Sequence, residues 1–327
     1  MSDDTAPTRV AIACQGGGSH TAFTAGVLQE ILSEWDDESY DLVGISGTSG
    51  GAFNALATWY GLLTGGPEAA VELLDSIWDD ITVSGAQDRW MNTLVTNISR
   101  MDSAGFAIPS VSPSQIPIPE VGKQRIRTIL ERHIDFEEIP DICQRDTPEL
   151  VVGTVNVNAG VFETFVNEDV TVEAVLASAA VPNMFEAVKI NGHYHWDGLF
   201  SQNPPVGDLM NLAPDRKPEE LWVIQVNPQT FEGEPTTSEV IADRRNELSG
   251  NISLNQELGF IDQVNEWVEN GKLPAEEFTK TDIHRIQMGK QYHCSTKVDR
   301  GPDFINELRE LGTRRAREFI ETKYAHP

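Results

Sequence analysis

The sequence predicts an α/β fold with a mainly parallel central sheet flanked by helices. Two buried, apolar strands are expected at Thr8–Cys14 and Tyr40–Gly47, and a helical pattern of apolar residues follows each of them. Strand–helix–strand–helix at this spacing is typical of a parallel sheet with right-handed crossovers. With 327 residues, 39% of them hydrophobic, the chain can bury one large core. We therefore expect a single α/β domain over residues 8–327, after a disordered N-terminus at residues 1–7.

The remaining elements follow from the same kind of pattern. Residues 149–157 and 160–167 are expected to pair as two strands, and residues 221–228 are expected to form a further buried strand. Helices are expected at residues 20–35, 51–63, 67–81, 121–134, 172–180, 238–270 and 302–324.

The chain is strongly acidic, with 51 Asp and Glu residues against 24 Lys and Arg residues and a net charge of −27. Nucleic-acid-binding proteins carry basic surfaces, so we expect no nucleic-acid partner. The acidic residues are spread along the chain and resemble the surface of proteins from salt-accumulating halophiles, in which high salt screens self-repulsion. Three cysteines give no disulfide framework, and neither a signal peptide nor a membrane-spanning stretch is predicted. These features favour a cytoplasmic protein.

Residues 85–122 differ from their surroundings and are expected to form a helical and proline-rich cap. Trp90, Leu94, Ile98 and Met101 recur at helical spacing, and four prolines follow that should prevent regular structure. Two interpretations are open. The segment is either a cap packed on the domain or a mobile apolar lid over a site for an apolar substrate.

Three consecutive glycines, Gly16, Gly17 and Gly18, separate the first strand from the first helix. Backbone N–H groups at the start of a helix attract negative charge, which could be a cofactor phosphate or an oxyanion formed during a reaction. A dinucleotide-binding fingerprint needs glycine at its sixth position, where this chain has Thr21. A P-loop sequence is absent as well. The sequence therefore disfavours a nucleotide cofactor.

A second glycine-rich turn, "GTSGG", lies between the second strand and the second helix. It contains Gly47, Ser49, Gly50 and Gly51 and matches G-x-S-x-G, the nucleophile elbow that exposes a serine hydroxyl on a sharp turn. The alternative is a turn of small residues in which the serine only caps a helix. The strand–turn–helix context favours the elbow.

A third segment, residues 177–206, places Asp197 and Gly198 in a turn after a short strand. In this order, the triple glycine, the G-x-S-x-G and the Asp-Gly pair resemble the patatin-like phospholipase family. The resemblance implies a three-layer sandwich with core motifs over residues 8–212 and a C-terminal helical completion over residues 236–325. The chain departs from the family pattern at His20, where Arg or Lys is usual, and at Leu199, where Gly or Ala is usual.

The resemblance also implies the roles of the site residues. Ser49 would be the nucleophile, Asp197 the base of a Ser–Asp dyad, and Gly16 to Gly18 the oxyanion hole, with no cofactor. No cluster of His, Cys and Asp has the spacing of metal ligands, so no metal is expected. His20, His195 and Gly198 are candidates for residues that support the dyad.

A histidine base stays open as an alternative. His195 and Asp197 face the same side of a strand, so a Ser49–His195–Asp197 relay is conceivable, although neighbours on one strand face have poor geometry for it. His284 or His293 would be the base if the chain followed the order of an α/β-hydrolase triad.

The implied function is hydrolysis of lipid acyl esters through an acyl-enzyme, with phospholipid or neutral lipid as the substrate. One alternative is an intracellular polyhydroxyalkanoate depolymerase with the same dyad. Another is an inactive protein that binds a lipid or granule surface. Each of these would place the protein in peripheral contact with a membrane or a storage granule.

Overall fold

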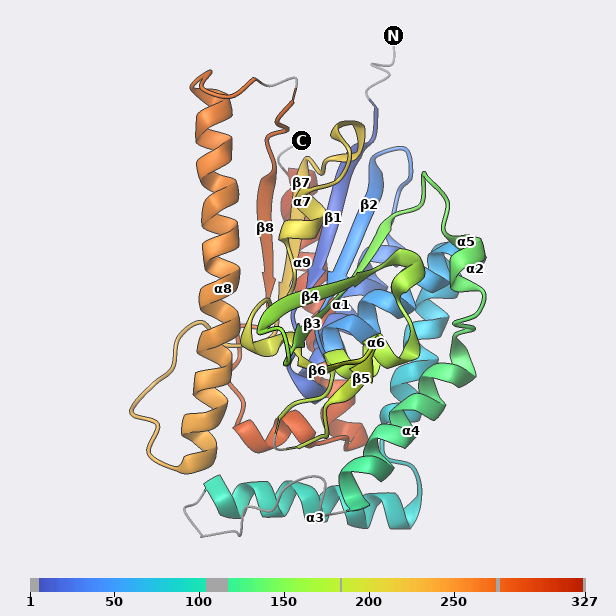
Figure 1. Cartoon of the computed structure of the whole chain (residues 1–327), viewed down its shortest axis with the longest axis vertical. Helices are drawn as coiled ribbons and strands as arrows, with labels where there is room; N and C mark the ends of the chain where they lie inside the picture. Colours follow the sequence, from blue (N-terminus) through green and yellow to red (C-terminus); the bar gives the residue numbers. More distant parts are fainter. Residues whose placement is uncertain (1–5, 104–116, 183, 275–276, 326–327) are drawn as a thin grey trace.

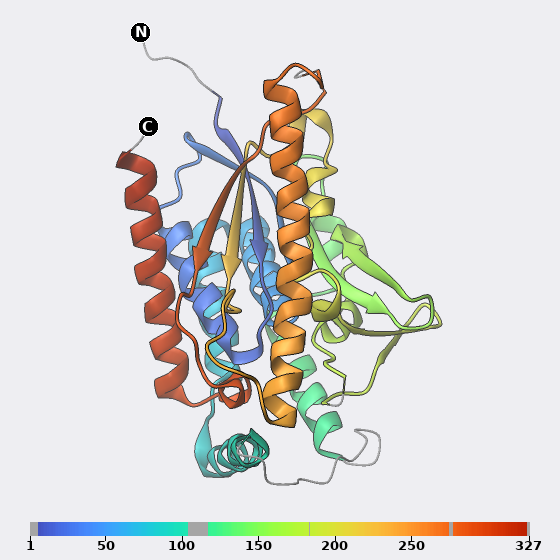
Figure 2. The same ribbon diagram turned by 90° about the vertical axis from the view of Figure 1, so that its left-hand side faces the viewer.

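The computed structural model describes residues 6–103, 117–182, 184–274 and 277–325, which form a sheet between two layers of helices (Figures 1 and 2). The strands are β1 (Thr8–Cys14), β2 (Tyr40–Gly47), β3 (Glu149–Asn156), β4 (Val161–Val166), β5 (Val188–Ile190), β6 (His193–Asp197), β7 (Glu220–Gln225) and β8 (Asp282–Gln287). Their order is β5-β6-β3-β2-β1-β7-β8, and β4 pairs with β3. The predicted α/β fold with a mainly parallel sheet is confirmed.

The parallel part of the sheet runs from β3 through β2, β1 and β7 to β8, whereas β4, β5 and β6 are antiparallel to their neighbours. The predicted bounds of β1 and β2 are confirmed, as is the pairing of β3 with β4. Strand β8, which lies at the edge of the sheet beside β7, is not among the strands predicted from the sequence.

The long helices are α1 (Ala22–Ser33), α2 (Gly50–Ile81), α3 (Gly85–Ser103), α4 (Pro117–His133), α8 (Ser238–Glu269) and α9 (Pro302–Ala325). Shorter helical elements are α5 (Ile139–Ile142), α6 (Val172–Ser178), α7 (Gly207–Met210) and the 3₁₀ turns η1 (Gly18–Thr21), η4 (Gly198–Phe200) and η6 (Cys294–Val298). Within the described part of the chain, no helix is both long and apolar enough to cross a membrane.

Alternate residues of each buried strand supply two separate hydrophobic cores, because successive side chains of a strand point to opposite faces. In β1, Val10 and Ile12 pack with the core formed by α1, α2 and α9, whereas Ala11 and Ala13 pack with the core under α7 and α8. Strand β7 divides in the same way. One core lies on each face of the sheet, so the sheet is the middle of three layers. Helix α8 covers much of one face (Figure 2).

The predicted break between the helices at 51–63 and 67–81 is confirmed: α2 leaves helical geometry at Gly66, with φ 82° and ψ −170°, just before Pro67. Two other predicted boundaries are corrected by the structure. The helix expected from residue 20 starts with the 3₁₀ turn η1, and α1 proper begins at Ala22. Pro117 and Pro119 lie in the first turn of α4 instead of an irregular segment, because proline fits the start of a helix. Of the predicted proline-rich stretch, residues 104–116 lie outside the described residues, as do residues 1–5 of the predicted disordered N-terminus.

Candidate active site

The sheet topology brings Ser49 and Asp197 together. Strand β4 pairs along one edge of β3, so β2 and β6 share the other edge. On that edge Gly47, the last residue of β2, lies opposite Val152, and Asp197, the last residue of β6, lies opposite Thr154. The two strands run in opposite directions, so the turns that follow them meet at the carboxyl ends of the parallel strands.

Ser49 occupies a sharp turn between β2 and α2. Its φ is 57° and its ψ is −129°, a strained conformation for a residue with a Cβ. A Cβ at Gly47 would lie 2.4 Å from the Gly51 carbonyl carbon, so this crossing of strand and helix requires glycine. The predicted strand–turn–helix context of an elbow is therefore present. Ser49 is only 7% exposed.

The backbone of this turn is held by Ser178, at the end of α6. The Ser49 N–H donates to Ser178 Oγ at 2.9 Å, and the Ser178 hydroxyl donates to the Gly153 carbonyl on β3 at 2.7 Å. Ser178 is fully buried, and sequence reasoning missed it. A serine in the small-residue run "ASAA" gives no signal by itself that it supports a turn far away in the sequence.

Asp197 is fully buried beside Ser49. Burial raises the pKa of its carboxyl to about 7, against smaller lowering effects of the Leu199 N–H and of the Ser49 side chain. Oδ1 accepts the Leu199 N–H at 2.9 Å, whereas Oδ2 has no hydrogen-bond partner at ordinary distance within the described residues. The Ser49 side chain lies close enough to the carboxylate to lower its pKa, although no hydrogen bond of ordinary length to Oδ2 is present within the described residues.

The glycine loop lies against this turn. A Cβ at Gly16 would lie 2.3 Å from the Thr48 carbonyl oxygen and 2.8 Å from Ser49 Cβ. The Gly16 N–H is donated to Asn203 Oδ1 at 2.6 Å, so the expectation that Gly16 offers this group to an oxyanion is wrong. Within the described residues, the N–H groups of Gly17 and Gly18 have no acceptor.

Two more of the predicted glycines lie where backbone segments approach closely. A Cβ at Gly50 would lie 2.1 Å from Thr21 Oγ1, and one at Gly198 would lie 3.0 Å from the Gly153 carbonyl oxygen. The glycine loop, the elbow and the turn after β6 are therefore packed directly on one another.

A buried network of amide side chains fixes the glycine loop. The Gly16 carbonyl accepts from Asn203 Nδ2 at 3.2 Å and from Asn227 Nδ2 at 2.9 Å. Gln15 Oε1 accepts the backbone N–H groups of Val226 and Asn227, while its Nε2 donates to Asn251 Oδ1 on α8 at 2.9 Å. Sequence reasoning missed these residues, because four amides spread over the chain show no local pattern.

His20, which stands where the family usually has Arg or Lys, is neutral in this fold. It is buried, and burial together with the Lys297 charge lowers its pKa to about 3. Its Nε2 lies 2.7 Å from Thr296 Oγ1. His20 is therefore a packing residue beneath the loop.

His195 has partners other than Ser49 and Asp197. Its Nε2 lies 3.0 Å from Glu163 Oε2 on β4, and its ring contacts Phe165 edge-on. The other two candidate histidines also have partners elsewhere: His284 lies 3.6 Å from Glu220, and His293 Nδ1 lies 2.8 Å from Ser295 Oγ.

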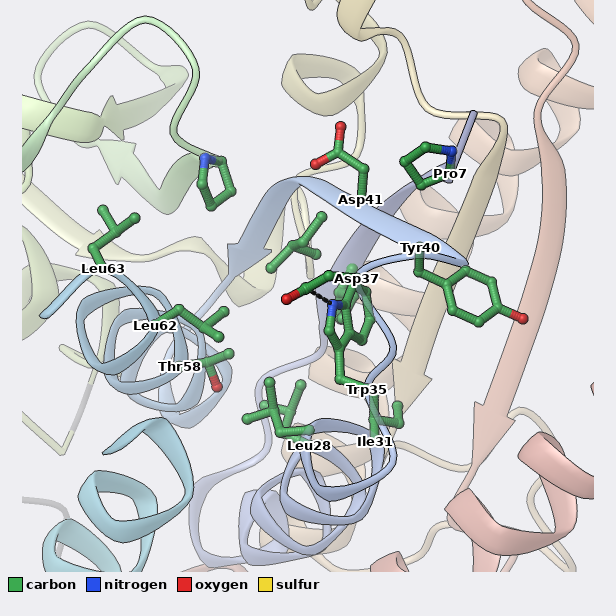
Figure 3. Close-up of a pocket in the computed structure, with 14 residues that line it drawn as sticks. Pro7, Leu28, Ile31, Trp35, Asp37, Tyr40, Asp41, Thr58, Leu62 and Leu63 are labelled. Carbon is green, nitrogen blue, oxygen red and sulfur yellow. Dashed lines mark hydrogen bonds between the residues drawn. The ribbon is translucent and has the colours of Figure 1, made fainter. Parts of the chain in front are cut away.

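A cavity of about 370 Å³ lies at the opposite end of the sheet, between α1, α2 and the first residues of β1 and β2 (Figure 3). Leu28, Trp35 and Leu62 contribute to its apolar walls, and neither Ser49 nor Asp197 lines it. The cavity is therefore separate from the Ser49 site. Among the described residues, no group of three His, Cys, Asp or Glu side chains is placed to hold a metal ion.

A profile of the family described as patatin-like phospholipase matches residues 12–210, and no curated protein matches. Among solved structures, VipD from Legionella pneumophila is similar with a TM-score of 0.41 and 12% identity over 94% of this chain and 67% of VipD. A chain in the structure of the ExoU–SpcU complex of Pseudomonas aeruginosa matches with a TM-score of 0.37 and 14% identity. The match covers 97% of this chain and 52% of the chain in that structure.

The family match covers more than half of the chain and includes all three motifs that meet at the Ser49 site. The chain therefore belongs to the patatin-like phospholipase family and is a lipid acyl hydrolase.

Proposed function

We propose that this hydrolase cleaves acyl esters with Ser49 as the nucleophile and Asp197 as the base. The observation that carries the proposal is the position of Ser49, on a strained turn beside a fully buried carboxylate whose pKa is raised to about 7. A base with a pKa near neutrality accepts a proton far better than an ordinary carboxylate and is still ionised in half of the molecules at that pH.

The proposed reaction has two halves. Asp197 takes the Ser49 hydroxyl proton as Oγ bonds to the ester carbonyl carbon, and the carbonyl oxygen becomes an oxyanion. When the oxyanion collapses, the carbon–alkoxide bond breaks, and Asp197 returns the proton to the leaving oxygen. Water then attacks the acyl-enzyme by the same proton transfers and releases the fatty acid.

The oxyanion would be stabilised by the N–H groups of Gly17 and Gly18. Support comes from the contact of the loop with the elbow and from the lack of an acceptor for these two groups within the described residues. Removing one such donor typically costs about 3–4 kcal/mol of transition-state stabilisation.

The pH dependence of turnover follows from the raised pKa of Asp197. The base must be deprotonated to act, so we expect kcat/KM to fall about tenfold per pH unit below about pH 7 and to reach a plateau above it. The measurement is a pH–rate profile on a soluble p-nitrophenyl ester at constant salt. A midpoint near the ordinary pKa of an aspartate, about 4, would contradict the buried base.

For the substrate, we propose the acyl ester of a phospholipid. Helix α3 lies across the end of the molecule at which the parallel strands end (Figure 1) and exposes Trp90 at 63% and Met101 at 50%. Residues 85–133 carry six Lys and Arg against four Asp and Glu, in contrast to the acidic whole. Lys123, Arg125, Arg127 and Arg132 are each in an ion pair with Asp or Glu, so the segment is close to neutral. Exposed apolar side chains on a near-neutral segment of an otherwise acidic protein suit a lipid surface, and the family description favours a phospholipid.

Substrate class is tested with a panel of phospholipid vesicles, triacylglycerol emulsion, a short-chain p-nitrophenyl ester and amorphous polyhydroxybutyrate, each at low and multimolar salt. We expect the highest rate on the vesicles. Turnover of the polyester alone would establish the depolymerase alternative, and turnover of none of the four would favour a surface-binding protein. A higher rate in multimolar salt is expected if the acidic surface reflects a saline cytoplasm.

The contact with the lipid surface is tested by substitutions in the cap (residues 85–122). Trp90→Asp combined with Met101→Asp should lower the rate on vesicles and leave the rate on the soluble ester unchanged, because each large apolar side chain contributes roughly 1.5–3 kcal/mol when it is buried. Phe260→Asp is the matched control. Phe260 is also 63% exposed, but it lies on α8, in the half of that helix that is more distant from α3 (Figure 1). Equal loss on both substrates with a lower melting temperature would show that the cap is only packed on the domain. Of the four residues in the predicted apolar stripe, the side chains of Leu94 and Ile98 lie outside the described residues.

A further inference from the structure

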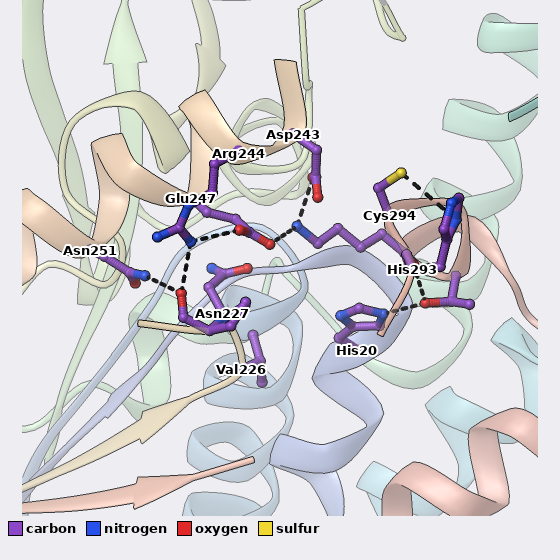
Figure 4. Close-up of polar contacts among 12 residues, drawn as sticks. His20, Val226, Asn227, Asp243, Arg244, Glu247, Asn251, His293 and Cys294 are labelled. Atoms are coloured by element: carbon purple, nitrogen blue, oxygen red, sulfur yellow. Dashed lines mark hydrogen bonds and ion pairs between the residues drawn. The ribbon is translucent and has the colours of Figure 1, made fainter. Parts of the chain in front are cut away.

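A cluster of charged side chains lies behind the glycine loop. Lys297, on η6, places its Nζ 2.7 Å from Asp243 Oδ1 and 2.9 Å from Glu247 Oε1, both on α8 (Figure 4). The side chain of Lys297 is 18% exposed and that of Glu247 is 7% exposed. Removing one partner of such a pair leaves an uncompensated charge in the interior, so the cluster holds its elements firmly together.

The backbone of Lys297 touches the loop directly. A Cβ at Gly18 would lie 2.3 Å from the Lys297 carbonyl oxygen, and Gly18 has a φ of 59°, which favours glycine. Beside this contact, His20 is joined to Thr296 at 2.7 Å. The position of η6 therefore limits where the Gly17–Gly18 peptide can lie.

Helix α8 also holds the other side of the loop, through residues next to the ion pair. Arg244 bonds Glu247 Oε2 at 3.0 Å and the Pro228 carbonyl at 3.1 Å, and Asn251 donates to the same carbonyl at 3.0 Å (Figure 4). Asn251 Oδ1 also accepts from Gln15, the residue before the glycines. Both flanks of the loop are thus attached to one helix.

We propose that Lys297, paired with Asp243 and Glu247, is a positioning residue that directs the Gly17 and Gly18 N–H groups at the oxyanion formed on Ser49. The proposal rests on the proposed function of this site. It assigns a catalytic consequence to a part of the chain beyond residue 210, where the family profile ends. The ion pair acts through the loop backbone and contacts neither the substrate nor Ser49.

The test compares Lys297→Met with Lys323→Met. Lys323 is 16% exposed and paired with Glu220, at the start of β7 and therefore at the other end of the sheet, so it is matched in burial and in type of partner. We expect Lys297→Met to lower kcat on the soluble ester about 10- to 100-fold with KM changed less than about twofold, because oxyanion stabilisation acts only in the transition state. Lys323→Met should lose a comparable amount of thermal stability and keep its kcat.

A second readout separates positioning from folding. A trifluoromethyl ketone with an octyl chain forms a tetrahedral adduct with the nucleophile, so its affinity for Lys297→Met should fall in parallel with kcat/KM. The pH midpoint should stay in place, since Asp197 is untouched. Asp243→Asn, which leaves Glu247 as a partner, should show the same effects at about 3- to 10-fold and covers the case in which Lys297→Met does not fold.

The outcomes distinguish the two proposals. A folded Lys297→Met protein with wild-type kcat and wild-type affinity for the ketone would overturn the positioning role and leave the dyad intact. Wild-type protein that neither turns over the ester nor binds the ketone would overturn the proposed function itself.

Discussion

Ser49→Ala is expected to lower ester hydrolysis by roughly 10⁵- to 10⁶-fold while the fold stays intact, because no other group in the site can form the acyl bond. Ser49 is nearly buried, and its strained turn is set by contacts of its backbone, not of its hydroxyl. Removing one oxygen therefore leaves those contacts in place. The measurement is the initial rate on a soluble ester together with the melting temperature.

Ser46→Ala is the matched control for this variant. Ser46 is a buried serine on β2 whose hydroxyl donates to the Pro205 carbonyl, so its loss removes a buried hydroxyl without touching the dyad. It should keep most of the activity. Substantial turnover by a well-folded Ser49→Ala protein would end the assignment of the nucleophile.

Asp197→Asn is expected to be nearly as damaging, with a loss of about 10⁴-fold or more, because the amide cannot accept the serine proton. The same substitution should lower activity but raise the stability of the fold. Burial raises the pKa of Asp197 to about 7, whereas in the unfolded chain it keeps the ordinary value of about 4, so the wild type loses stability as pH rises from about 4 to about 7. At pH above about 8 the Asp197→Asn protein should melt at a higher temperature than the wild type, and below about pH 4 the difference should vanish.

Two controls accompany this variant. The first is Asp208→Asn, because burial raises the pKa of the Asp208 carboxyl as it does that of Asp197. Asp208 lies on α7, away from Ser49, so this variant should keep its activity. His195→Ala should be mild, because His195 is bonded to Glu163 and not to the dyad. A dead His195→Ala protein beside an active Asp197→Asn protein would reverse the assignment of the base.

Much of the site was predictable because its chemistry is local in the sequence. Gly47, Ser49 and Gly51 lie within five residues, and the strand before them is apolar enough to define its own ends. The same holds for the triple glycine after β1, whose predicted bounds match the structure. Backbone that must turn sharply or approach closely needs glycine, and this need is visible in sequence.

What could not be predicted depends on contacts between distant segments. Gly16 was expected to donate to an oxyanion, but the partner of its N–H is Asn203, 187 residues away. Ser178 holds the Ser49 backbone across 129 residues for the same kind of reason. Strand β8 was missed because "DIHRIQ" at a sheet edge mixes charged and apolar residues, and only its pairing with β7 shows that it is a strand.

The central claim, that Ser49 is a nucleophile activated by Asp197, is tested most directly by an alkyl fluorophosphonate, which reacts with activated serines. Intact-protein mass and peptide mapping after incubation should show one adduct, on the peptide that contains Ser49, in the wild type. The same measurement should show no adduct on Ser49→Ala and a strongly slowed reaction on Asp197→Asn. An adduct on another serine, or equal labelling of the wild type and Asp197→Asn, would contradict the dyad.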